Sequence, residues 1–329
     1  MDNDIKKYLK ILKKTEKSIK KLPIKELDHD VKQLKKAFDI AYDNEVFALY
    51  KYESTIQDKL KFLLFCKLTK YSGTLSFLAI QILAANSIMN KNNFSKRKFY
   101  FNKKCGIAIN HLRVNKTIIS AKKCKNGYKL NGVLTWASGY KIFDKLLIGF
   151  HFENKEYEVL TDFKVTKKFK IAQAPETLVG YSLNTINVKL EDFFVKEENI
   201  VSSNSIGNYT KNKSLSKTVH YALYGIGLGA VKNIENKKLK SSSKSRLKKI
   251  KNKFLNSNNG EELDKLRIEL FNLIQDVITT GMILNGGSSI LLEKNLQRYY
   301  RELIMFNSNG LNTKIKTLFL ESFLNKYMP

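Results

Sequence analysis

Three polar side chains of different chemistry lie together in the stretch 106–113. Asn110 carries an amide, His111 an imidazole that titrates near neutrality, and Arg113 a guanidinium with parallel donors. His111 is therefore a candidate acid or base, and Arg113 is a candidate ligand for a phosphate or carboxylate. A polar surface loop leading into the next folded region explains the same residues equally well, so both interpretations stay open.

The only tryptophan of the chain closes a second stretch that could do chemistry. Residues 127–138 read Gly-Tyr-Lys-Leu-Asn-Gly-Val-Leu-Thr-Trp-Ala-Ser, which places Trp136 between the hydroxyl-bearing Thr135 and Ser138. A large flat ring at the end of a strand either fills a core or offers a platform for a cofactor. Taken without its flanking pattern, the ring favours the packing role.

Alternating apolar and polar residues predict that these side chains sit on a β-domain. Tyr128 and Leu130 alternate with polar neighbours, and Asn131-Gly132 has the residues of a type I′ turn, which predicts a β-hairpin. Short runs rich in β-branched and aromatic residues follow, and we expect strands there too. These runs are Leu146–Phe152, Tyr157–Phe163, Leu178–Leu183 and Ile186–Leu190. Their spacing is typical of a small antiparallel barrel or sandwich.

Both ends of this β-domain resemble the middle domain of the acyl-CoA dehydrogenase family. Residues 127–138 resemble the family's Gly-x-Tyr-x-Leu-Asn-Gly-x-Lys-x-Trp-Ile-Thr pattern. Residues 185–200, Thr-Ile-Asn-Val-Lys-Leu-Glu-Asp-Phe-Phe-Val-Lys-Glu-Glu-Asn-Ile, resemble its closing strand. With this pattern in view, the cofactor role of Trp136 becomes the favoured one.

The flanking sequence has the helical periodicity that the same family would require. Apolar residues recur at three- and four-residue spacing between positions 9 and 68, which predicts three amphipathic helices. Ser72–Asn86 is apolar nearly all round and predicts a buried helix. Further helices are expected at His220–Ala230, Glu262–Leu284 and Leu311–Leu324. The expected fold is α+β, with an N-terminal helical domain at 1–95, a β-domain at 96–205 and a C-terminal helical bundle at 206–329.

The resemblance implies a cofactor, a substrate class and an assembly. It implies bound FAD, with Thr135, Trp136 and Ser138 against the flavin ring and Asn110 in the polar wall beside them. Gly286 and Gly287 match a glycine pair whose backbone approaches the cofactor in the family, although a helix cap explains them equally well. An acyl-CoA-like substrate and a homodimer or homotetramer, with cofactor sites partly built across subunits, are also implied.

The sequence departs from the family at the catalytic base. Counting from Arg301-Glu302 places Gly310, Leu311 and Asn312 where the family's usual Glu-Gly-Thr turn stands, and the alternative base position falls on Val219. The family's cofactor and substrate loop, Thr-Glu-Pro-x-x-Gly-Ser-Asp, is replaced by residues 106–113. Two functions therefore stay open. One is a divergent FAD-dependent oxidoreductase, or an enzyme of the related flavin monooxygenase type. The other is a non-catalytic binding or assembly protein.

A net charge of +29 raises the question of nucleic-acid binding. The lysine-rich run 237–253 supports it best, but only six of the 59 basic residues are Arg and the run contains no aromatic residue. We therefore expect no nucleic-acid partner, and a solvated helix or a mobile loop at 237–253.

Composition also bounds the compartment. Residues 1–21 carry many charges and no apolar signal core, and the apolar stretch 75–89 is shorter than the ~20 residues that span a bilayer. A cytoplasmic protein without membrane insertion is expected. Cys66, Cys105 and Cys124 lack the spacing of a disulfide framework or a metal site, so no metal is expected.

Overall fold

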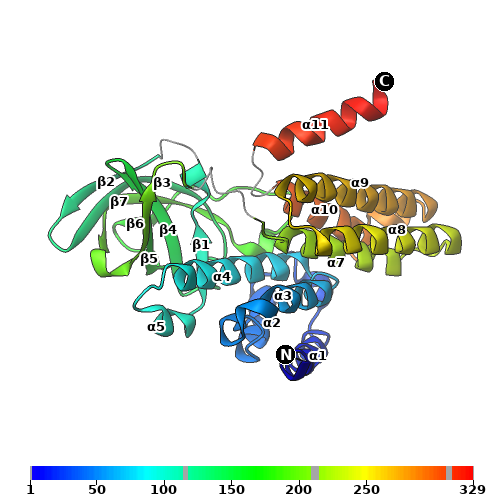
Figure 1. Cartoon of the computed structure of the whole chain (residues 1–329), viewed down its shortest axis with the longest axis horizontal. Helices are drawn as coiled ribbons and strands as arrows, with labels where there is room; N and C mark the ends of the chain where they lie inside the picture. The colour runs from blue at the N-terminus through cyan, green and yellow to red at the C-terminus, as the bar shows by residue number, and fades with distance from the viewer. Residues whose placement is uncertain (1, 114–117, 209–214, 309–312, 329) are drawn as a thin grey trace.

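The computed structural model describes residues 2–113, 118–208, 215–308 and 313–328. Helices form both ends of the chain and strands form its middle, so that the β-domain lies to one side of two groups of helices (Figure 1). The expected α+β fold is confirmed.

The N-terminal part is a group of helices built around α4. It comprises α1 (Asp2–Ile19), α2 (Val31–Asp43), α3 (Ser54–Leu68), α4 (Gly73–Lys91) and the short α5 (Arg97–Phe101). Ser72 caps α4, because its hydroxyl accepts the Leu75 N–H at 3.0 Å. By length and composition α4 could cross a membrane, but 67% of its apolar stretch is buried inside the molecule. The predicted buried helix is confirmed, and it extends to Lys91.

The strands of the described residues form two four-stranded sheets. One sheet has the order β1-β4-β5-β8 and the other β2-β3-β7-β6. Their bounds are β1 Cys105–Ala108, β2 Ile119–Cys124, β3 Gly127–Ala137, β4 Lys145–Phe152, β5 Lys155–Asp162, β6 Phe169–Ile171, β7 Ile186–Lys196 and β8 Ile200–Ser205. The pairing is antiparallel except between β1 and β4. Tyr128, Phe150 and Tyr157 join the sheets through ring contacts of 5.0 to 5.6 Å.

Two sequence predictions inside the β-domain were wrong. Asn131-Gly132 does not turn the chain but lies within β3, where the register with β7 shifts. Gly132 has a φ of +140°, and a Cβ there would lie 2.2 Å from the Ile118 carbonyl oxygen, so the glycine serves an irregular strand. The turn between β2 and β3 instead uses Asn126, with a φ of +63°. A type I′ turn and an irregular strand both accept Asn and Gly, so the local sequence did not distinguish the two structures.

The run Leu178–Leu183 forms no strand and ends in a 3₁₀ turn, Tyr181–Leu183. Its polar groups bond to the N-terminal part instead of to a neighbouring strand. The Ser182 hydroxyl donates to the Leu27 carbonyl at 2.6 Å, and the Ser182 N–H donates to the Asp28 carbonyl at 3.1 Å. Contacts with a distant segment therefore override the local β preference.

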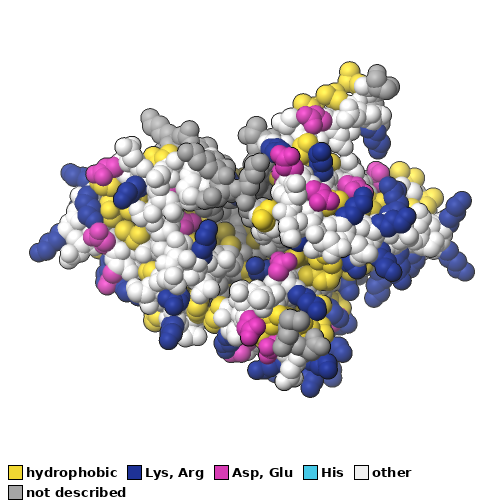
Figure 2. Space-filling model, viewed as in Figure 1, with side chains coloured by type: hydrophobic (Ala, Val, Ile, Leu, Met, Phe, Trp, Pro, Cys, Tyr) yellow, Lys and Arg dark blue, Asp and Glu magenta, His cyan; other side chains and the backbone are white. Residues whose placement is uncertain are grey.

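The C-terminal part consists of helices. They are α7 (Thr218–Lys232), α8 (Lys237–Asn256), α9 (Gly260–Leu284), α10 (Asn295–Ser308) and α11 (Thr313–Tyr327). The lysine-rich run 237–253 is helical and lies in α8, which buries Leu247, Ile250 and Phe254 and turns its lysines outward (Figure 2). α11 stands apart from the other helices (Figure 1) and contacts α9, where Phe319 meets Phe271.

A buried ion pair fixes α10 to the N-terminal helices. Glu302 is fully buried and accepts from Arg298 Nη1 at 3.0 Å and from the Gly73 N–H at 2.7 Å. Arg298 also donates to the carbonyls of Lys70 and Tyr71, at 3.2 and 3.0 Å. The charges therefore satisfy the backbone at the α3–α4 connection.

A second buried carboxylate, that of Asp28, joins all three parts of the chain. Its carboxylate pairs with Arg301 of α10 and accepts the Gly180 N–H of the β-domain at 3.0 Å. Asp28 itself belongs to the α1–α2 connection and is buried. A single carboxylate thus positions the β-domain against both helical parts.

Glu302→Ala tests the first of these contacts. Because the substitution leaves Arg298 and the Gly73 N–H buried without their acceptor, we expect the free energy of unfolding to fall by about 3–5 kcal/mol. Urea unfolding followed by circular dichroism measures this, with the exposed Glu321→Ala of α11 as the control. A loss below about 1 kcal/mol, as for a surface pair, would contradict this role.

Candidate functional site

Trp136 lies on a bulge at the end of β3. The register between β3 and β7 shifts between Leu134 and Ala137, and Trp136 has a φ of +59°. Its N–H donates to Asn187 Oδ1 at 3.0 Å, which holds this unusual backbone in place. The indole side chain is 55% exposed. A bulky residue that combines a left-handed backbone with an exposed aromatic ring is a pattern found at binding sites.

The hydroxyls near Trp136 point partly inward. Ser138 is buried, and its Oγ lies 2.8 Å from Thr185 Oγ1. Either hydroxyl can donate to the other, so the accepting one keeps its own proton for a further acceptor. Thr135 is half-buried beside the bulge. Thr135, Trp136 and Ser138 therefore lie together, as one continuous stretch must. The structure adds Asn187 of β7 and Thr185, which directly precedes β7.

Asn110, His111 and Arg113 form a 3₁₀ turn, Asn110–Arg113, that follows β1. The turn packs closely on β4, because Leu112 occupies the space where a Cβ of Gly149 would stand, 2.5 Å from its Cγ. His111 Nε2 lies 2.8 Å from the Gly149 carbonyl oxygen. Since a carbonyl only accepts, Nε2 carries the proton and Nδ1 is the basic nitrogen.

The environment of His111 favours its neutral form. Burial is the largest effect and lowers the pKa of the imidazole, the bond to Gly149 raises it, and nearby His151 lowers it further. The net pKa is below the ordinary value of 6.5. At neutral pH His111 is therefore a base and not an acid.

The charge of Arg113 in the β-domain acts on a second arginine, Arg267 of the C-terminal helices. Arg267 of α9 is only 6% exposed and donates to Asn307 Oδ1 at 3.2 Å and to the Phe306 carbonyl at 3.1 Å. Burial lowers the pKa of Arg267 to about 10, Asp264 opposes this, and the charge of Arg113 adds to it. Two guanidinium groups thus share one electrostatic environment at this junction.

Sequence analysis missed Arg267. The signal was available, because this arginine interrupts the apolar stripe of α9 formed by Leu263, Leu266 and Leu270. A charged residue in such a stripe requires buried partners. Those partners, Phe306 and Asn307 at the end of α10, could not be identified from spacing.

Gly286 and Gly287 lie away from Trp136. The first turn of α9 is near the β-domain, and the helix runs away from it for 25 residues, about 37 Å (Figure 1). Gly286 follows its end with a φ of +70°, and a Cβ there would meet nothing within 4 Å. Within a single chain the glycine pair therefore does not share a site with Trp136. Its contact with a cofactor stays a prediction.

The positions matched to the family's catalytic base supply no carboxylate. Val219 is a half-buried apolar residue of α7, and Gly310, Leu311 and Asn312 lie outside the described residues. Over the described ranges, no group of three or more His, Cys, Asp or Glu side chains could hold a metal ion.

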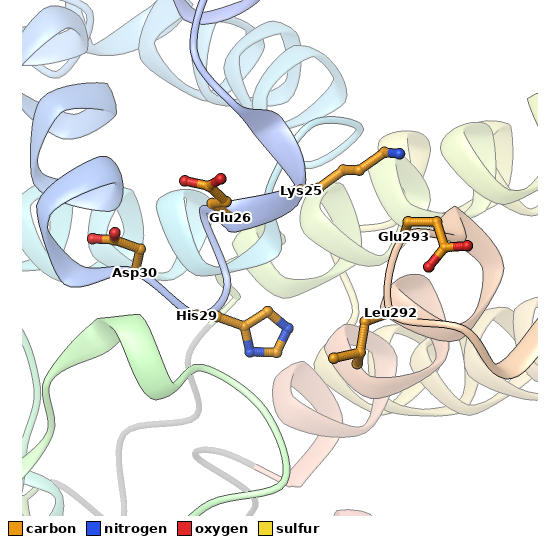
Figure 3. Close-up of a pocket in the computed structure, with 6 residues that line it drawn as sticks. All are labelled: Lys25, Glu26, His29, Asp30, Leu292 and Glu293. Carbon is orange, nitrogen blue, oxygen red and sulfur yellow. The ribbon is translucent and has the colours of Figure 1, made fainter.

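A separate pocket of about 560 Å³ lies between the α1–α2 and α9–α10 connections (Figure 3). Lys25, Glu26, His29, Asp30, Leu292 and Glu293 line it. His29 and Leu292 face one another across it, whereas the side chains of Glu26 and Asp30 point away from Leu292. It contains none of the predicted site residues.

The protonation of His111 is directly measurable. We expect its imidazole to titrate below 6.5, because burial disfavours the charged ring. NMR spectra of the ring protons recorded against pH test this, and His111→Gln assigns the signal among the four histidines. A titration midpoint at or above 6.5 would contradict the buried, carbonyl-bonded geometry.

No protein-family model matches the chain, and no curated protein matches its sequence. Solved structures do match its fold. Butyryl-CoA dehydrogenase from Megasphaera elsdenii superposes with a TM-score of 0.75 at 14% identity, covering 97% of both chains. Glutaryl-coenzyme A dehydrogenase in its glutaryl-CoA complex gives 0.77 at 13%, covering 97% of this chain and 95% of the other. KijD3, in complex with FMN and a dTDP-sugar, gives 0.74 at 11%, covering 98% and 94%.

These likenesses extend over nearly the whole chain and follow its order of helices, strands and helices. They confirm the resemblance noted for residues 127–138 and 185–200 at the level of fold. The chain has the acyl-CoA dehydrogenase fold.

Proposed function

We propose that the chain is a flavoprotein that binds FAD against the exposed face of Trp136. The observation that carries this proposal is the strained bulge that presents the indole to solvent, at the position where the family pattern expects a flavin platform. A flat ring stacked on the indole would gain area and favourable ring contact. Thr135, Ser138 and the backbone around them would supply the polar contacts.

The junction between the β-domain and the C-terminal helices suits an anionic substrate or cofactor group. Arg113 and Arg267 contribute positive charge to it, with Asp264 as an opposing negative charge, and positive charge attracts an anionic group. Asn110 is exposed on the same turn as Arg113 and could add an amide contact. We propose an acyl-CoA-like or acyl-thioester-like substrate for this region.

A homo-oligomer would bring Gly286 and Gly287 to a cofactor held by another copy. This part of the proposal rests on the large exposed side chains around the pair. These are Ile283, Leu284, Ile290 and Leu291. An apolar surface of this kind next to open glycine backbone fits a subunit contact.

The reaction we propose is a flavin-dependent oxidation that does not use the family's usual glutamate. Bound FAD would accept electrons from the substrate or react with oxygen. Among this chain's own groups, His111 offers a neutral imidazole whose Nδ1 can take a proton. Flavin monooxygenase-type chemistry, which needs no carboxylate to remove an α-proton, fits the apolar Val219.

The second candidate is a non-catalytic binding or assembly protein of the same fold. The apolar side chain of Val219 and the replaced loop at 106–113 favour it. Fold alone does not establish activity, so flavin content separates the two candidates.

The stacking contact can be tested by substitution. Trp136→Ala should weaken FAD binding about threefold to tenfold, because an aromatic contact contributes ~0.5–1.5 kcal/mol beyond its buried area. Calorimetric titration of flavin-free protein measures this. The control is Leu320→Ala, which removes an exposed apolar side chain from α11. Equal FAD affinity of the wild-type and Trp136→Ala proteins would show that the Trp136 ring does not contact the flavin.

A further inference from the structure

A second groove lies between α5 and the β-domain. It has a volume of about 800 Å³, within the range of small-ligand sites. One wall is the segment 95–100, which leads into and includes most of α5, and the other comes from the ends of β5 and β7. In Figure 1, α5 lies under the β-domain, away from the C-terminal helices.

The groove carries an excess of positive charge. Five lysines line it against two acidic residues: Lys96, Lys98, Lys145, Lys164 and Lys196 against Asp162 and Glu198. Asp162 pairs with Lys145, while Glu198 accepts from Lys96 at 2.9 Å and lies 3.5 Å from Lys196. Among the described residues, Lys98 and Lys164 are in no ion pair. Their ammonium groups are therefore free to meet an anionic ligand.

Exposed aromatic rings lie among these lysines. Phe99 is 56% exposed and touches Tyr100 edge-on, with ring centroids 5.1 Å apart. Phe194 is 42% exposed, although it belongs to a strand. A Cβ on Gly127 would lie 2.8 Å from its ring, so the glycine lets Phe194 pack against β3 on one side. The Lys103 ammonium lies over the Phe99 ring, 5.4 Å from its centroid, so Phe194 offers the open ring surface for stacking.

The groove is distinct from the Trp136 site. Phe194 pairs with Lys129, and Trp136 lies seven residues further along β3. At about 3.3 Å per residue the two rings belong to positions roughly 23 Å apart. A flavin ring stacked on Trp136 therefore leaves the groove open.

We propose that this groove binds a nucleotide, with its phosphates held by Lys98 and Lys164 and its base stacked on Phe194. The combination of unpaired lysines with exposed rings matches a ligand that is anionic at one end and planar at the other. Base stacking and phosphate attraction are the two interactions by which proteins hold single-stranded nucleic acids without sequence preference, and one nucleotide offers both groups. The volume of the groove accommodates a mononucleotide.

ATP is the probe, titrated calorimetrically against the full chain. Lys98→Gln/Lys164→Gln should weaken ATP binding about tenfold, because each substitution removes one cation without a protein partner. Lys248→Gln/Lys249→Gln on α8 is the matched control, with the same change of net charge on exposed residues. It should leave the affinity within about twofold. Phe194→Ala should weaken binding about tenfold by loss of stacking.

Four results would overturn the assignment. Equal losses of ATP affinity in the two double-lysine variants would show a general attraction to the protein's positive charge. Binding of inorganic triphosphate as tightly as ATP would show that no ring stacks on the base. Displacement of ATP by saturating FAD would place both ligands in one site. Single-stranded oligothymidine binding that depends on Lys248 and Lys249 would point to a nucleic acid instead. Thermal melting of each variant checks that these exposed substitutions leave the fold intact.

Discussion

Asp28 and Glu302 are carboxylates removed from water, and each can remain there only because cations and backbone N–H groups surround it. Their partners come from distant parts of the chain: Arg301 and Gly180 for Asp28, Arg298 and Gly73 for Glu302. Such pairs fix geometry, since any displacement leaves a buried charge without its partner. The position of the β-domain against α9 and α10 follows from this constraint.

The candidate site has one part within a single sheet and a second part that spans the β-domain and the C-terminal helices. Trp136 is held by its own strand, because the bulge in β3 and the bond to Asn187 lie within a single sheet. Arg113 instead lies in the β-domain and Arg267 in α9, so their relative placement depends on how these two parts pack, to which the contacts of Asp28 contribute. A change at Asp28 should therefore disturb the anionic end of a bound ligand more than the ring on Trp136.

The order of elements was predictable because apolar periodicity and the motif at 127–138 are local properties of the sequence. α4, α7 and α9 follow directly from them. The strand expected at 178–183 failed because Ser182 bonds to Leu27, a partner about 150 residues earlier. The positive φ of Trp136 also depends on Asn187 in another strand. Arg267 was visible as an irregularity in an apolar stripe, but its partners at the end of α10 required the folded chain. In each case the missing information was a contact between distant segments.

We propose that Trp136 forms the floor of a flavin site. The visible absorption spectrum of the protein as purified, followed by denaturation and identification of any released flavin, tests it most directly. We predict one FAD per chain, with the absorption bands of a bound flavin. A colourless protein that also takes up no added FAD would contradict the claim and leave the non-catalytic role of the fold.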